Sequence, residues 1–141
     1  MNTLFDVKRL CRLIANLNIL TSVPANILDA QGRDRYLFGG HPPFCKAINA
    51  DPEGHARCIR CDAWKAKHYH ADGGFQFYRC HLGICEALMP LYSKEEPLAY
   101  LIFGCYLDDS PIEEQWERTR ALLDWWQGSL DELHSAFLQF R

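Results

Sequence analysis

The chain lacks any run of 18 or more apolar residues, so no segment is suited to cross a membrane as a helix. A basic stripe is missing as well, because 15 lysines and arginines are balanced by 18 aspartates and glutamates for a net charge of −3. This balance provides no electrostatic footprint for nucleic acid. We therefore expect these residues not to bind DNA by themselves.

The motifs of common enzyme classes are also missing. The sequence has no G-x-S-x-G, no glycine-rich phosphate loop and no H-E-x-x-H. We therefore expect a binding function and no enzymatic activity, with a small cysteine-dependent enzyme as the third class considered. Internal repeats and low-complexity segments are absent too.

Cysteine is present in an odd number, seven, within 141 residues of which 48% are hydrophobic. A chain of this size can bury one core and does not need disulfides to hold it. The N-terminal segment is amphipathic, carries charges and has no small-residue cleavage site, unlike a signal peptide. We expect a reduced, cytoplasmic protein whose thiols are core residues or ligands.

Hydrophobic periodicity and turn residues divide the chain into helices and strands. Helices are expected at 3–17, 44–49 and 52–70, strands at 25–30, 35–38, 75–81, 86–92 and 98–106, and further helices after Ser110 and Ser129. Two strands, a helical insert and a three-strand meander are the connectivity of a PAS-type sensor. We predict a single mixed α/β (α+β) domain, PAS-like, with a five-stranded antiparallel sheet, a helical insert and flanking N- and C-terminal helices.

Three helix starts carry capping signals. Asp51 can cap a helix that has Pro52 at its first position, and Ser110 and Ser129 can cap the two C-terminal helices. The final helix should place Leu130, Leu133, Phe137 and Leu138 on one face and run to the last residue.

Cysteine and histidine are concentrated between residues 55 and 85. The members of this group are His55, Cys58, Cys61, His68, His70, Cys80, His81 and Cys85. Cys58 and Cys61 form a C-x-x-C on an expected helix, a spacing that allows shared metal binding or a labile disulfide. With Cys45 and Cys80 they could hold zinc or an iron–sulfur cluster, and His81 or Cys85 are alternative ligands. The alternative is that these thiols are simply buried core residues.

The strand expected at 75–81 should place Phe75, Phe77 and Arg79 on one face and Gln76, Tyr78 and Cys80 on the other. Neighbours on a strand point to opposite faces, so Cys80 and His81 are not expected to act as a nucleophile–base pair. Glu86 is either a polar group directed into a pocket or a solvated edge residue.

A set of spaced residues resembles one known family. It comprises Cys45, Glu53-Gly54, Cys58, Tyr78, Cys80-His81, Gly83, Glu86, Pro90 and Gly104. The pattern is similar to that of PocR sensory domains, over roughly residues 5–110 as the core. The resemblance implies a PAS-like module that senses small hydrocarbon derivatives, commonly N-terminal to an AraC-type DNA-binding domain or joined to kinase or cyclase outputs.

The resemblance leads to a sensor hypothesis for residues 1–141, with residues 111–141 as helices leading to an output domain. The expected ligand is a diol, alcohol or similar molecule, and the candidate lining groups are Tyr78, Cys80, His81, Glu86 and Cys105. Cys105 stands where the family usually has glutamine, and Cys61 stands where serine is frequent. The alternative is a metal, iron–sulfur or thiol-redox sensor. DNA would be contacted only through the output domain, and two copies would pair through the terminal helices.

Overall fold

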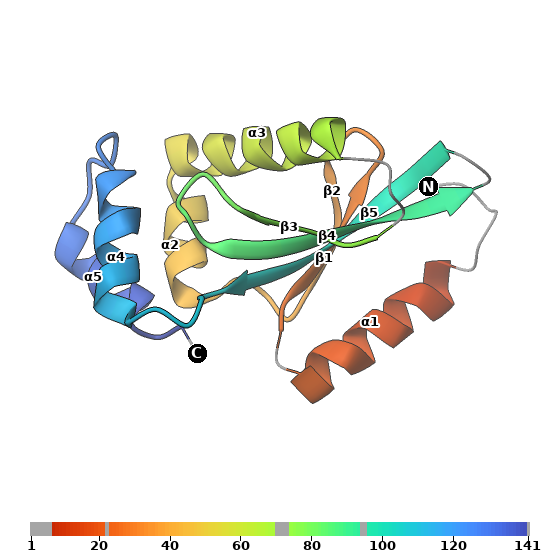
Figure 1. The fold of residues 1–141 in the computed structure, drawn as a ribbon, viewed down its shortest axis with the longest axis horizontal. Helices are drawn as coiled ribbons and strands as arrows, with labels where there is room; N and C mark the ends of the chain where they lie inside the picture. The colour runs from red at the N-terminus through yellow and green to blue at the C-terminus, as the bar shows by residue number, and fades with distance from the viewer. Residues whose placement is uncertain (1–6, 22, 70–73, 94–95, 141) are drawn as a thin grey trace.

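The computed structural model describes residues 7–21, 23–69, 74–93 and 96–140 (Figure 1). The elements are α1 (Val7–Thr21), β1 (Ala25–Asp29), β2 (Asp34–Phe38), α2 (Pro43–Ala50), α3 (Pro52–His68), β3 (Gln76–Arg79), β4 (Cys85–Ser93), β5 (Glu96–Tyr106), α4 (Ile112–Ala121) and α5 (Leu130–Phe137). Helices and strands follow in blocks and not in strict alternation. The α+β class, the antiparallel sheet and the helical insert expected from the sequence are confirmed.

The strands pair antiparallel in the order β2-β1-β5-β4-β3. The last strand in the chain, β5, lies between β1 and β4 and pairs with both. It therefore joins the strands that precede the helical insert to those that follow it. A strand in this central position needs apolar residues on both faces, and every residue from Ala99 to Ile102 is buried.

Helices cover both faces of the sheet, α1 on one side and α3 on the other (Figure 1). Ile27 and Leu101 lie on the α1 side, where they pack with Ile14. Their neighbours Leu28 and Ile102 belong to a separate cluster on the α3 side. The alternation of side chains along β1 and β5 therefore supplies two thin cores from the same strands.

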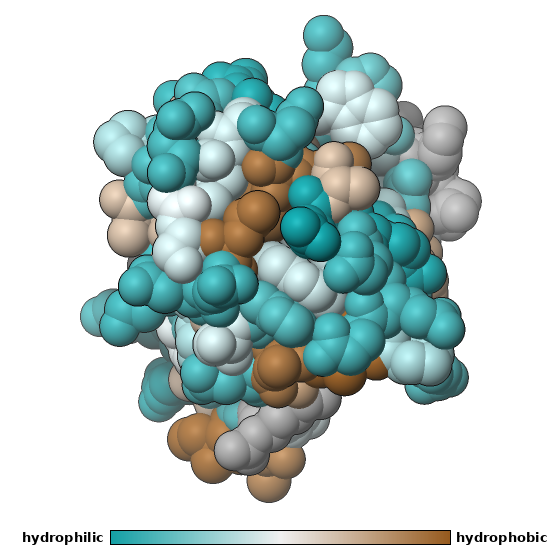
Figure 2. Space-filling model, turned by 90° about the vertical axis from the view of Figure 1, so that its left-hand side faces the viewer, coloured by the Kyte–Doolittle hydropathy of each residue, from teal (hydrophilic) through white to brown (hydrophobic). Residues whose placement is uncertain are grey.

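The C-terminal helices α4 and α5 lie at one end of the sheet beside α2 (Figure 1). Phe44 of α2 packs edge-on against Phe137 of α5, with ring centroids 5.4 Å apart. Trp116 of α4 belongs to the same buried cluster, and the Thr119 hydroxyl donates a 2.8 Å hydrogen bond to the Leu82 carbonyl. The outer surface of this end is largely hydrophilic, with hydrophobic atoms showing in small patches (Figure 2). Through this buried cluster, α4 and α5 pack against α2 at this end of the sheet.

Two of the expected helix caps are confirmed. The Asp51 carboxylate accepts a 2.9 Å hydrogen bond from the Gly54 amide, and Pro52 follows it at the first helical position. The Ser129 hydroxyl accepts a bond from the Glu132 amide at 3.2 Å. Each side chain satisfies an amide that the helix leaves without a partner.

The cap expected at Ser110 is wrong. Helix α4 has Pro111 at its N-cap position and no side-chain capping bond. Gln115, from inside the helix, instead holds the segment that precedes it: its side-chain amide nitrogen donates to the carbonyls of Asp108 and Ser110, at 3.1 and 2.6 Å. The position of α5 also differs from the prediction, because this helix ends at Phe137 and Leu138 is 43% exposed.

Three further boundaries differ from expectation. Helix α1 continues to Thr21 and not to residue 17, and its expected start at residue 3 lies outside the described part. Helix α3 ends at His68, and His70 lies outside the described residues. Strand β3 ends at Arg79, two residues early, because a turn follows it.

We predict that Gly54→Ala destabilises the fold. A Cβ atom at this position would lie 2.1 Å from the Ile48 carbonyl oxygen, because α2 and α3 meet there at close range. We expect a loss of about 1–3 kcal/mol in the free energy of unfolding, the usual cost of overpacking. Urea denaturation followed by circular dichroism measures it. The control Lys67→Ala, at an exposed position of the same helix, should change stability by less than about 0.5 kcal/mol. Equal stability of both variants would contradict the close approach.

Candidate ligand-binding pocket

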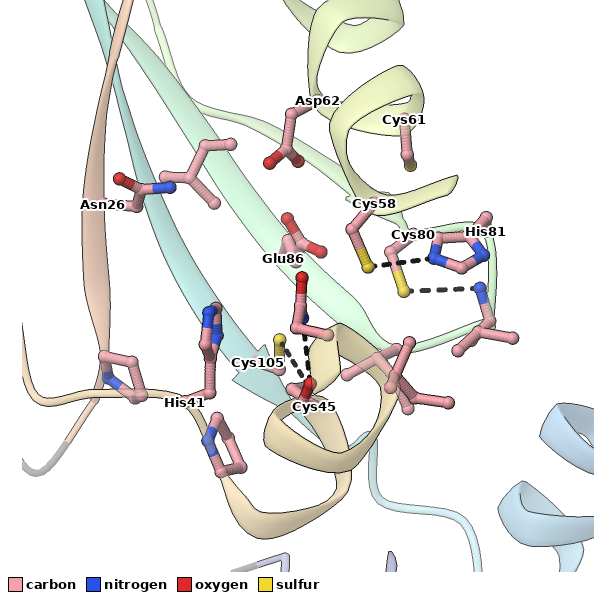
Figure 3. Close-up of a pocket in the computed structure, with 18 of the residues that line it drawn as sticks. Asn26, His41, Cys45, Cys58, Cys61, Asp62, Cys80, His81, Glu86 and Cys105 are labelled. Carbon is pink, nitrogen blue, oxygen red and sulfur yellow. Dashed lines mark hydrogen bonds between the residues drawn. The ribbon is translucent and has the colours of Figure 1, made fainter. Parts of the chain in front are cut away.

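A cavity of about 100 Å³ lies between the helical insert and the sheet (Figure 3). Helices α2 and α3, the ends of β1, β4 and β5, and the turn after β3 all contribute to its wall. The apolar part of the lining consists of Pro24, Ala25, Pro42, Phe44, Ile48, Ile59, Leu82, Ile84 and Ile102, apart from the cysteines. The polar part consists of Asn26, His41, Asn49, His55, Asp62, Lys65, His81 and Glu86. Such a mixture of apolar walls with a few polar groups is typical of small-molecule sites.

Five of the seven cysteines line this cavity. They are Cys45, Cys58, Cys61, Cys80 and Cys105, which come from four separate segments of the chain (Figure 3). Of the candidate ligand-contacting residues, the structure therefore brings Cys80, His81, Glu86 and Cys105 together in one wall.

A buried ion pair joins α3 to the sheet beside the cavity. The ammonium group of Lys65 lies 2.8 Å from a carboxylate oxygen of Glu86 and 3.3 Å from one of Asp62. Only 3% of the Lys65 side chain is exposed. Burial alone would lower the pKa of Lys65, but the two carboxylates outweigh it and raise that pKa above its usual value. Lys65 is therefore charged, and Glu86 is a buried pocket residue and not a solvated edge residue.

Tyr78 lies behind this ion pair and does not line the cavity, so the expectation for this residue is wrong. Its ring is 4.5 Å from the Lys65 ammonium nitrogen, a cation–π contact. Burial raises the pKa of the Tyr78 hydroxyl above its usual range. Among the described residues this buried hydroxyl has no hydrogen-bond partner. Tyr78 therefore contacts a residue of the lining, Lys65, and not the cavity itself.

The two faces predicted for the strand around residues 75–81 are confirmed within β3. Phe77 is 72% exposed and Arg79 shares the exposed face, as does Phe75, which directly precedes the strand and is 48% exposed. Gln76 and Tyr78 alternate with them and are partly buried. The inner face is thus the one that places the Tyr78 ring against Lys65 of α3.

The expectation that Cys80 and His81 point to opposite faces is wrong. The strand ends before them, and a turn closes where the Gly83 amide donates to the Cys80 carbonyl at 2.9 Å. Gly83 has a φ of +80°, which glycine adopts without strain. Because the turn breaks the alternation, both Cys80 and His81 line the cavity.

His81 and Cys58 form a neutral thiol–imidazole contact. The His81 Nε2 atom lies 3.2 Å from the Cys58 Sγ atom (Figure 3). Burial lowers the pKa of His81 to about 4 and raises the pKa of Cys58 to about 12. A nucleophilic pair needs a thiolate, and these shifts keep the thiol protonated at neutral pH. The contact is therefore suited to binding and not to catalysis.

The residues expected as metal ligands, Cys45, Cys58, Cys61 and Cys80, all reach the cavity. In the part of the chain that the structure describes, however, no group of three or more His, Cys, Asp or Glu side chains could hold a metal ion. The thiols take other partners: Cys58 contacts His81, and Cys45 contacts Cys105. The prediction of a zinc or iron–sulfur site therefore gains no geometric support.

Sequence reasoning missed Lys65 and Asp62 as members of the site. A signal for them was present, because Cys58, Asp62 and Lys65 recur at intervals of four and three on α3. Residues at these intervals share one face of a helix. Extending the face that carries the C-x-x-C by one turn would have placed both charged residues beside the thiols.

A comparison with protein-family models places residues 3–140 in the PocR family, described as the sensory domain found in PocR. The match covers almost the whole chain, so the chain belongs to this family of ligand-sensing domains, which are generally non-catalytic. No curated protein and no solved structure matches the chain. Among the described residues, no helix is both long and apolar enough to cross a membrane.

We predict that Lys65→Met strongly destabilises the protein. The substitution leaves the Glu86 carboxylate buried without its main partner, which costs about 3–5 kcal/mol in comparable cases. The double variant Lys65→Met/Glu86→Leu should recover much of the loss, because it removes both charges. Urea denaturation measures all variants. The control Arg120→Ala removes an exposed ion pair and should cost less than about 1 kcal/mol. A single variant as stable as this control would contradict the role of the pair.

The lowered pKa of His81 predicts a loss of stability as the pH falls from about 6.5 to about 4. In this range the unfolded state binds a proton at His81 and the folded state does not, so the free energy of unfolding falls as pH falls. The variant His81→Gln should lose this part of the dependence. Thermal melting at pH 7, 6 and 5 tests it, with His68→Gln, on the exposed end of α3, as the control. An unchanged slope in His81→Gln would show that His81 is not the group responsible.

Proposed function

We propose that this chain is a PAS-like sensor of a small, neutral molecule with both polar and apolar parts, such as an alcohol or a diol. The observation that carries the proposal is the mixed cavity between the helical insert and the sheet, whose polar residues come from separate segments and converge. Membership of a sensory family supports the same conclusion.

The size of the cavity favours a very small ligand. Its volume is about 100 Å³. A dry protein cavity of about 150 Å³ accommodates benzene, so a ligand of roughly four to six non-hydrogen atoms fits here. Short alcohols, diols and aldehydes fall in this range.

The chemistry of the lining favours a ligand with hydroxyl groups. Glu86 is a hydrogen-bond acceptor at the wall, held in place by Lys65. Ile48 and Ile84 provide apolar surface for a short carbon chain. A hydroxyl group that donates to Glu86 while its carbon skeleton contacts these side chains would satisfy both kinds of surface.

Helix α2 provides a route from the cavity to the C-terminal helices. Phe44, Cys45 and Ile48 of this helix line the cavity, and Phe44 also packs on Phe137 of α5. A ligand that favours one position of α2 would therefore bias α5 as well, provided that it binds the two arrangements with different affinities. An output domain that contacts DNA, and the pairing of two copies through terminal helices, stay predictions.

Calorimetric titration of the reduced protein with a panel of small alcohols, diols and aldehydes tests the proposal. For the ligand that binds, Glu86→Gln and His81→Ala should each weaken affinity by about 5- to 150-fold, which corresponds to about 1–3 kcal/mol for an unpaired buried polar group. The control Asp108→Asn lies outside the cavity lining and should leave affinity unchanged.

Both pocket variants are needed because Glu86→Gln also weakens an ion pair. Circular dichroism first establishes that each variant is folded. Unchanged affinity in both folded variants would remove the ligand from this cavity. Failure of every member of the panel to bind would contradict the proposed ligand class.

A further inference from the structure

Two thiols from distant parts of the chain meet in the wall of the cavity. The Sγ atoms of Cys45, in the first turn of α2, and Cys105, near the end of β5, are 3.4 Å apart (Figure 3). The two residues are 60 positions apart in the sequence. No local spacing brings them together, so their contact results from the packing of α2 against the end of the sheet.

The C-x-x-C pair is arranged differently. The Cys58 thiol contacts the His81 ring at 3.2 Å, and the Cys61 sulfur interacts with the His81 backbone. Each of these sulfurs therefore has a partner other than the neighbouring cysteine. The contact between Cys45 and Cys105 is the better candidate for thiol chemistry.

We propose that Cys45 and Cys105 form a site of reversible oxidation, which closes to a disulfide in the presence of a small peroxide. The bond requires the sulfur atoms to move from 3.4 Å to about 2.05 Å, a short displacement for two side chains already in contact. This inference goes beyond ligand sensing and does not depend on the identity of the ligand.

Hydrogen peroxide is a suitable oxidant, because it is small and neutral and can therefore enter a cavity of about 100 Å³. One sulfur attacks a peroxide oxygen, so that an S–O bond forms, the O–O bond breaks and one water leaves. The second sulfur attacks the resulting sulfenic acid, so that the S–S bond forms, the S–O bond breaks and a second water leaves. Two thiols and one peroxide give one disulfide and two waters, and the two thiol protons end in the waters.

The environment of the Cys105 thiol determines the rate of oxidation that we expect. The hydrogen bond with Cys45, together with burial, raises the pKa of the Cys105 thiol well above its usual value. The thiolate is the reactive form, so oxidation is slow at neutral pH and becomes faster as pH rises. Peroxide treatment should therefore need more time at neutral pH than at higher pH.

The location of the pair connects oxidation to the cavity. Both residues belong to the lining, and a bond between them ties α2 to β5 across one part of the wall. Helix α2 also packs on α5 through Phe44 and Phe137. Oxidation therefore restrains the same helix that would respond to a ligand.

Peptide mapping of the full chain tests the proposal, because trypsin separates the relevant cysteines. Cleavage after lysine and arginine leaves Cys45 in residues 36–46, Cys58 in 58–60, Cys61 in 61–65 and Cys105 in 95–118. After hydrogen peroxide treatment and alkylation of free thiols, mass spectrometry should detect residues 36–46 joined to 95–118 with the loss of two hydrogens. Dithiothreitol should release both peptides with free thiols.

Matched variants identify the pair. Cys45→Ser and Cys105→Ser should each abolish the cross-link and leave the partner thiol free or singly oxidised. Cys58→Ser should form the cross-link as the parent does, since Cys58 is not part of the pair. The oxidised parent should melt at a higher temperature than the reduced parent, because the bond closes a loop of 60 positions. This rise should be absent in Cys105→Ser.

Two results would overturn the proposal. One is a cross-link between residues 58–60 and 61–65 in place of the expected one, which would assign the chemistry to the C-x-x-C. The other is peroxide treatment that leaves Cys45 and Cys105 unlinked in a folded parent protein. Neither result depends on whether an alcohol or a diol binds, so failure here is distinguishable from failure of the proposed sensing function.

Discussion

The ion pair between Lys65 and Glu86 is the interaction on which the geometry of the site depends. It is buried and joins the last turn of α3 to the start of β4, which are otherwise held together by apolar contacts. Apolar contacts are not directional, so they permit a helix to slide or rotate on a sheet. A charged hydrogen bond of 2.8 Å specifies one position, because leaving either charge unpaired in the interior is costly. The width of the cavity follows from this position of α3.

Helix α2 forms another part of the cavity wall. It lies between the cavity and the C-terminal helices. Phe44 contacts both Phe137 and Phe140, while Cys45 and Ile48 face the cavity. The same eight-residue helix therefore serves as a lining element and as a contact to α5. The proposed route from the cavity to the C-terminal helices therefore runs through this short element.

Much of the fold could be predicted from local patterns, and the exceptions have physical causes. The strands of the sheet were evident from alternation, and the caps at Asp51 and Ser129 from residue type and spacing. Ser110 carried an equally good local signal, but it does not cap the helix, and the Gln115 side chain donates hydrogen bonds to the Asp108 and Ser110 carbonyls there. The strand expected at 75–81 was predicted two residues too long at its end. The turn that ends it depends on Gly83 and on backbone hydrogen bonds, which the alternation of hydrophobic residues does not predict.

The sequence by itself determined the class of fold, the faces of the strands and the family, because these depend on periodicity and on short motifs with defined spacing. Tertiary structure alone decided which side chains meet. It placed Cys105 against Cys45 and Lys65 against Glu86, and it moved Tyr78 out of the cavity lining. The physical reason is range: local patterns extend over a few residues, whereas these contacts join positions 60 and 21 apart and result from packing α2 and α3 on the sheet.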